Sequence, residues 1–200
     1  AERILDMLAG AMAELVVGDP ALLSTDVGPA IDRESVAILE AHAGRMAREG
    51  KLIFETPLGP DTEHGSFFAP RAFEIASLDL LKREVFGPIL HVVRYDAEHL
   101  EAVCEAINRT GYGLTLGIHS RIDETARQIT RMVRVGNTYI NRNMVGAVVG
   151  VQPFGGEGLS GSGPKAGGPR TLARFATERT VTMNTTASGG NAALMSLGDS

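Results

Sequence analysis

The sequence predicts an α/β fold with a mainly parallel sheet. Between residues 89 and 140, apolar runs with the composition of strands alternate with segments of helical periodicity. This order of strand, helix, strand, helix and strand is typical of right-handed crossovers between parallel strands. Further apolar runs upstream are separated by turns rich in glycine and proline, which supports additional strands.

In the first third of the chain we expect two helices followed by two strands. Apolar residues recur at helical spacing over residues 3–17, and Gly18-Asp19-Pro20 would end that helix. Asp32 can cap a second helix, whose apolar face includes Leu39 and which stops at Gly50. The two strands are expected at residues 52–54 and 67–75.

The middle of the chain is the most regular part. Strands are expected at residues 89–95, 114–119 and 138–140, with helices at residues 97–108 and 122–133 between them. Functional loops of such sheets lie beyond the carboxyl ends of the strands. The glycine-dense segment 141–169, which follows the last of these strands, is therefore the predicted functional region. Residues 180–183 then return as a short strand, before a tail rich in glycine, alanine and serine.

The composition argues against several classes of protein. The net charge is -5 and lysine and arginine form no stripe, which argues against a nucleic-acid-binding surface. The single cysteine cannot form an internal disulfide, and no apolar run is long enough to cross a membrane. The first residues lack both an initiating methionine and a signal-peptide pattern, so we expect a cytoplasmic protein whose chain continues upstream.

Residues 156–161 match the pattern GxGxxG, but we expect no dinucleotide site there. Such a site needs a strand before the turn and a helix after it, so that the helix N-terminus receives the pyrophosphate. The glycines and prolines of residues 162–169 cannot form that helix, and Lys165 follows a proline where a P-loop requires glycine. We predict a close-packed glycine loop that lets backbone segments approach each other.

Cys104 is the only thiol in the chain. It shares a helical face with Leu100, Val103 and Ile107, so we predict a core residue rather than a nucleophile. The five histidines show no metal-ligand spacing. We therefore expect no metal site, and place the histidines at the surface or in a second layer.

Glu84 and Phe86 are candidates for cofactor contacts. They precede Gly87-Pro88, where the chain must turn sharply before a buried strand. A carboxylate at such a turn can accept hydrogen bonds from both hydroxyls of a ribose, and an aromatic ring offers a flat apolar surface to a planar ligand. From the pattern alone, a solvated glutamate and a core phenylalanine explain the same residues at least equally well.

Three motifs resemble the downstream half of aldehyde dehydrogenases. They are Glu84-Val85-Phe86-Gly87-Pro88, Asn108-Arg109-Thr110-Gly111-Tyr112-Gly113-Leu114 and Pro153-Phe154-Gly155-Gly156. The run 146–156 and the run 163–169 are similar to glutamate-γ-semialdehyde (1-pyrroline-5-carboxylate) dehydrogenases, especially the C-terminal part of the bifunctional proline utilization A (PutA) proteins. The segments 182–186 and 189–191 support the bifunctional version.

The resemblance implies roles for five residues. Glu84 would bind the nicotinamide-ribose hydroxyls of NAD, and Phe86 would pack near the nicotinamide. Gly146 and Ala147 would anchor the substrate's α-carboxylate through backbone N–H groups, and Phe154 would pack on its aliphatic carbons. No catalytic residue is expected in this chain, because the nucleophilic cysteine, the general base and the cofactor domain would lie upstream. FAD would be bound only if a proline dehydrogenase domain is also fused upstream.

The resemblance also divides the chain in two. Residues 1–178 would be the downstream part of the catalytic domain, and residues 179–200 an oligomerisation strand and tail. The implied parent is an NAD-dependent dehydrogenase that oxidises L-glutamate γ-semialdehyde to glutamate in proline catabolism and forms homo-oligomers; this piece would be inactive alone. Two alternatives stay open: an aldehyde dehydrogenase for another acid semialdehyde, and a non-catalytic family relic that acts as a binding or assembly module.

Overall fold

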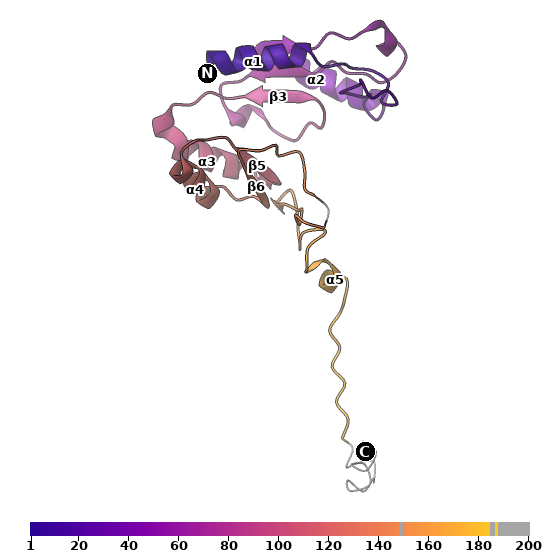
Figure 1. Cartoon of the computed structure of the whole chain (residues 1–200), viewed down its shortest axis with the longest axis vertical. Coiled ribbons are helices and arrows are strands. Elements are labelled where there is room, and N and C mark those ends of the chain that lie inside the picture. The colour runs from indigo at the N-terminus through magenta and orange to yellow at the C-terminus, as the bar shows by residue number, and fades with distance from the viewer. Residues whose placement is uncertain (149, 185–186, 188–200) are drawn as a thin grey trace.

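The computed structural model describes residues 1–148, 150–184 and 187. In Figure 1, α1, α2 and a three-stranded sheet form an upper layer, and α3, α4, β5 and β6 form a lower one. The chain then leaves the lower layer through α5 and runs away from it towards the C-terminus. No helix within the described ranges is long and apolar enough to span a membrane.

The upper layer holds the main hydrophobic core. Its elements are α1 (Glu2–Ala13), α2 (Arg33–Glu49), β1 (Lys51–Glu55), η1 (Pro60–Thr62), β2 (Arg71–Glu74), η2 (Leu78–Leu80) and β3 (Ile89–Val92). β2 pairs antiparallel with β1 and parallel with β3. As predicted, Asp32 caps α2, because its carboxylate accepts a hydrogen bond from the Ser35 amide at 2.7 Å. The core cluster consists of Leu39, Ala43, Met46, Phe68, Phe73 and Ile75.

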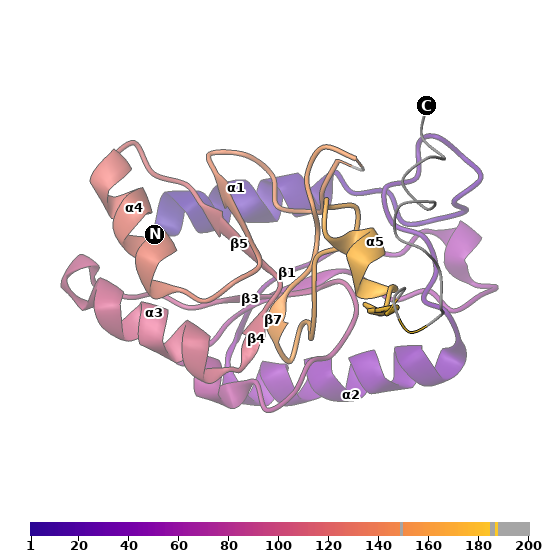
Figure 2. The same ribbon diagram turned by 90° about the horizontal axis from the view of Figure 1, so that it is seen from below.

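The second half of the chain supplies the remaining elements. They are η3 (Ala97–His99), α3 (Leu100–Arg109), β4 (Tyr112–Gly113), β5 (Thr115–Ile118), α4 (Asp123–Met132), β6 (Asn137–Ile140), β7 (Glu157–Gly158) and α5 (Thr171–Arg174). β5 and β6 pair in parallel with α4 between them, as the sequence predicts. β4 pairs antiparallel with β7 and so brings the glycine-rich segment back to this layer. Figure 2 shows α3 and α4 together on one side, with the loops that lead to α5 on the other.

The predicted α/β class is confirmed, with differences in the sheets, in helix α1 and in one predicted strand. The described strands form one three-stranded and two two-stranded sheets instead of one continuous sheet, and two of their four pairings are parallel. Helix α1 also ends at Ala13 rather than at residue 17. Beyond that helix the Val16 amide donates to the Asp26 carboxylate at 2.9 Å, and Val17 forms a bridge with Val27. The last apolar residues of the predicted helix therefore pair with residues 26–27 of the loop that follows.

The strand predicted at residues 180–183 is not formed. Val181 and Met183 are 73% and 75% exposed, and no described strand pairs with this segment. A strand needs a neighbour for its backbone N–H and C=O groups, and the described part of the chain offers none here. Oligomerisation through residues 179–200 stays a prediction, and residues 188–200 lie outside the described ranges.

Candidate functional site

Strand β6 is connected by side chains to the loops that follow it. Asn137 and Tyr139 are alternate residues of the strand and both are buried, so they lie on the same face. The Tyr139 hydroxyl donates a hydrogen bond to the Gly146 carbonyl at 2.6 Å. Lys165, from the glycine-rich segment, donates to the Gly136 carbonyl just before the strand. Both ends of the predicted functional segment are therefore attached to β6.

The backbone of Phe154 is held from two directions. Its N–H and C=O form hydrogen bonds with the C=O and N–H of Ala166, at 3.0 and 2.9 Å. On either side of it, the Asn137 amide nitrogen donates to the Pro153 carbonyl at 3.0 Å, and the Asn137 amide oxygen accepts from the Gly155 N–H at 3.3 Å. The Phe154 side chain is half-buried at this fixed position, so it can offer an apolar surface to a ligand.

The amides of Gly146 and Ala147 are available to a ligand. Among the residues that the structure describes, neither N–H has a hydrogen-bond partner. A Cβ built on Gly146 would find no other atom within 4 Å, so there is open space beside the loop. Adjacent free N–H groups in a loop can bind an anion, which agrees with the predicted carboxylate anchor.

The GxGxxG segment is a close-packed turn, as predicted. A Cβ on Gly156 would lie 2.6 Å from the Cβ and carbonyl oxygen of Ser160, and a Cβ on Gly158 would meet the Gly111 carbonyl. Gly158 also has φ of 59°, a conformation that favours glycine. The next helix within the described ranges is the four-residue α5, thirteen residues after Gly158 by sequence number, so the strand–turn–helix of a dinucleotide site is not formed here.

Glu84 is an exposed carboxylate without a described partner. Its side chain forms neither an ion pair nor a hydrogen bond with any residue in the described ranges. It lines a cavity of about 490 Å³, which Tyr112 and Leu159 border from the second half of the chain. A free acceptor at the edge of a cavity is suitable for binding a diol.

Phe86 is 90% exposed, so the alternative of a core phenylalanine is wrong. Its ring borders an apolar cavity of about 500 Å³ between the Gly87-Pro88 turn and the start of α2. Ile31, Ser35 and Leu39 line the same cavity. An aromatic ring exposed to this extent has surface free for a planar ligand.

The structure brings the five candidates only partly together. Glu84 and Phe86 lie on one loop but line different cavities. Gly146 and Ala147 line neither of these cavities, and nor does Phe154. The cofactor candidates and the substrate candidates therefore belong to separate walls in the described part of the chain.

Cys104 lies in the core, as predicted. It is 1% exposed, and burial raises the pKa of its thiol. A reactive cysteine requires the opposite, an accessible thiol with a lowered pKa. Within the described residues no cluster of three or more histidine, cysteine or acidic side chains could hold a metal ion.

A pair formed by a buried histidine, His42, and a half-buried one, His91, was not predicted from the sequence. The Nε2 atoms of His42 and His91 are 2.9 Å apart, and His42 is 7% exposed. Burial, followed by the positive charges of Arg45 and Arg83, lowers the pKa of His42; burial, followed by His42 and Arg45, lowers the pKa of His91. The available signal was that His42 occupies the apolar face of α2, three residues after Leu39.

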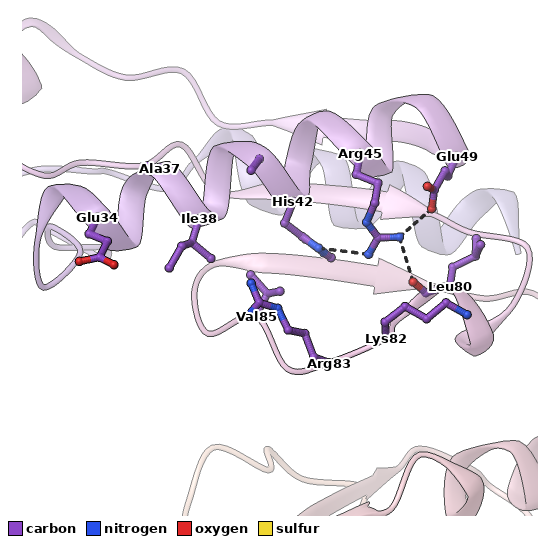
Figure 3. A pocket seen from close by; sticks show the side chains of 11 residues that line it. Glu34, Ala37, Ile38, His42, Arg45, Glu49, Leu80, Lys82, Arg83 and Val85 are labelled. Atoms are coloured by element: carbon purple, nitrogen blue, oxygen red, sulfur yellow. Dashed lines mark hydrogen bonds and ion pairs between the residues drawn. The ribbon is translucent and has the colours of Figure 1, made fainter.

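His42 lines a groove of about 820 Å³ between α2 and the 80–85 loop. Figure 3 shows Arg45 reaching from α2 towards that loop, where it donates to the Leu80 carbonyl at 3.0 Å. The same guanidinium donates to Glu49 at 2.7 Å and lies 3.5 Å from Nδ1 of His42. Arg45 thus connects the helix to the segment that carries Glu84.

Comparison with known proteins identifies relatives over most of the chain. The profile described as the aldehyde dehydrogenase family matches residues 1–181. The bifunctional protein PutA of Klebsiella aerogenes is 52% identical over 184 residues, which are 90% of this chain and 14% of that protein.

Two solved structures give the same result. A crystal structure of a variant of proline utilization A (PutA) from Bradyrhizobium japonicum is 59% identical with a TM-score of 0.87, covering 94% of this chain and 19% of that one. A Thermus 1-pyrroline-5-carboxylate dehydrogenase with bound NAD is 35% identical with a TM-score of 0.76, covering 86% of this chain and 33% of that one. The chain thus spans from about a seventh to a third of the length of these relatives.

Proposed function

This chain belongs to the aldehyde dehydrogenase family, and on that premise we propose that it is the downstream part of an NAD-dependent L-glutamate γ-semialdehyde dehydrogenase. The parent would oxidise the semialdehyde, which forms from 1-pyrroline-5-carboxylate, to glutamate in proline catabolism. The high similarity to PutA proteins supports this substrate. The catalytic cysteine and the general base would lie upstream, so this segment would be inactive alone.

The observation that carries the substrate assignment is the pair of unpartnered amides at Gly146 and Ala147 beside open space. Each N–H donated to a carboxylate contributes about 1.5–3 kcal/mol, so two can distinguish an amino-acid aldehyde from an uncharged aldehyde by roughly two orders of magnitude or more. Phe154 would pack on the aliphatic carbons of the substrate. Hydrogen bonds to Ala166 and Asn137 fix the backbone around Phe154 and would hold its ring in position for that contact.

For the cofactor, the chemistry of the available side chains fits NAD. The unpartnered Glu84 carboxylate would accept hydrogen bonds from the hydroxyls of the nicotinamide ribose. The exposed Phe86 ring would pack near the nicotinamide. When bound, NAD supplies the acceptor for the hydride that leaves the substrate carbon.

The test compares two aldehydes in the full-length polypeptide that carries this segment. NADH formation is followed with glutamate γ-semialdehyde and with butanal, an uncharged aldehyde. In the Gly146→Val variant, the added branched side chain would obstruct the anchor, and we expect KM for the semialdehyde to rise roughly 10-fold or more while KM for butanal changes little. Gly59→Val is the matched control, because a Cβ there also meets no atom within 4 Å.

Three outcomes would contradict the proposal. If the unmodified enzyme oxidised a different acid semialdehyde in preference, the substrate assignment would be wrong. If it oxidised no aldehyde, the alternative of a non-catalytic family relic would replace the proposal. If Gly146→Val left the preference for glutamate semialdehyde over butanal unchanged, the hypothesis that this loop binds the substrate carboxylate would be wrong.

A further inference from the structure

Tyr139 fixes one point of the loop that contains Gly146 and Ala147. Its side chain belongs to the buried face of β6, and 5% of the residue is exposed. From there the hydroxyl donates to the Gly146 carbonyl at 2.6 Å, a short distance for an O–H···O hydrogen bond. The loop is thus held by the strand that precedes it, across seven residues.

This hydrogen bond sets the orientation of the peptide that joins Gly146 to Ala147. The described peptide bonds include no cis bond, and in a trans peptide the C=O and N–H groups point in opposite directions. With the Gly146 carbonyl turned towards Tyr139, the Ala147 N–H points away from that ring. This N–H donates to no residue within the described ranges, so it is free to donate to a ligand.

The positively charged side chain of Arg142 lies over the same ring. The Arg142 guanidinium lies 5.0 Å from the centroid of the Tyr139 ring, within the range of a cation–π contact. Arg142 is exposed and forms no ion pair with any residue in the described part of the chain. The contact helps to hold the ring, and the charge favours an anion near the loop.

We propose that Tyr139 is a positioning residue that directs the Ala147 amide at the α-carboxylate of the substrate. The inference rests on the proposed function of the loop and adds the residue that determines its geometry. Tyr139 does not touch the substrate in this arrangement. Its effect therefore falls on the binding of the carboxylate and not on the chemistry at the aldehyde.

The Tyr139→Phe variant of the full-length enzyme removes the hydroxyl and keeps the ring. We expect KM for glutamate γ-semialdehyde to rise roughly 3- to 10-fold, as for the loss of one hydrogen bond, with kcat within about two-fold. KM for butanal should stay unchanged, because that aldehyde has no carboxylate. The inhibition constant of the product glutamate should rise by the same factor as KM for the semialdehyde, and it reports on binding without chemistry.

Tyr95→Phe is the matched control, since Tyr95 is 52% exposed and its hydroxyl forms no hydrogen bond with the loop within the described part of the chain. In this variant, KM should be unchanged for both glutamate γ-semialdehyde and butanal. The inference is overturned if Tyr139→Phe leaves the semialdehyde KM and the glutamate inhibition constant unchanged, or if it raises KM equally for butanal. Failure of the proposed function is distinguishable, because then the unmodified enzyme would show no preference for glutamate semialdehyde over butanal.

Discussion

Replacing Asn137 with alanine should loosen the backbone that carries Phe154. The Asn137 amide joins the Pro153 carbonyl and the Gly155 N–H, at 3.0 and 3.3 Å. Alanine would leave both groups without this partner, at a cost of about 1–3 kcal/mol each. Because Phe154 keeps its two hydrogen bonds to Ala166, we expect the lower part of that sum, about 2–3 kcal/mol. Local opening should then be roughly 30- to 150-fold more frequent.

Hydrogen–deuterium exchange of the full-length protein, read by mass spectrometry of peptides, measures this change. Amides of residues 154–156 should exchange faster in Asn137→Ala, while those of α2 serve as an internal reference. Asn108→Ala is a matched control, because the Asn108 amide also donates to one backbone carbonyl and accepts from one backbone N–H, but at Met132 and Arg134. It should leave the exchange of residues 154–156 unchanged. Equal exchange of this segment in the alanine variant and the unmodified protein would refute the reasoning.

Three further predictions concern other parts of the chain. Glu84→Ala should raise KM for NAD about 10- to 100-fold through lost ribose contacts, with folding intact, while Glu105→Ala should not. Cys104→Ala should lower stability by on the order of 1 kcal/mol, seen as a lower melting temperature, without loss of activity. For His42 and His91, the pKa values are lowered in the folded state, so the unfolded state binds more protons below pH 6.5. The melting temperature should therefore be highest above pH 6.5 and fall as the pH drops through the lowered pKa values, less steeply in His91→Gln.

Each of these predictions has a clear contrary result. Unchanged NAD kinetics in Glu84→Ala would remove its cofactor role. Complete loss of activity in a natively folded Cys104→Ala would mean that the nucleophile lies in this chain. An identical pH dependence of melting in His91→Gln would show that the histidine pair does not control acid stability.

Much of the fold could be predicted because its signals are local. Asp32 caps α2 through the Ser35 amide three residues away, and the apolar face of that helix follows the usual periodicity. The parallel pair β5–β6 follows from the strand–helix–strand order. Cys104 was placed correctly in the core from the residues that share its helical face.

The site depends on contacts between distant residues, and the sequence gives no pattern for those. Lys165 contacts Asn137, which is 28 residues away in the sequence. The Tyr139 hydroxyl donates a hydrogen bond to the Gly146 carbonyl, and no periodic pattern in the sequence predicts that contact. The pair β4–β7 has two residues per strand, too few for an alternating pattern. Residues 180–183 have the alternation of a strand, but a strand also requires a neighbour, which the described chain does not provide.

The glycines of the second half differ in what a side chain would meet, and this has a consequence for mutational tolerance. A Cβ on Gly113 or Gly136 would meet a backbone oxygen, whereas a Cβ on Gly146 would meet nothing within 4 Å. In a saturation library, selection for soluble expression should therefore deplete substitutions at the first two positions and retain them at Gly146. Selection for growth on proline as a nitrogen source should deplete substitutions at all three glycines. Comparing the two selections would therefore distinguish glycines that folding requires from a glycine that substrate binding requires.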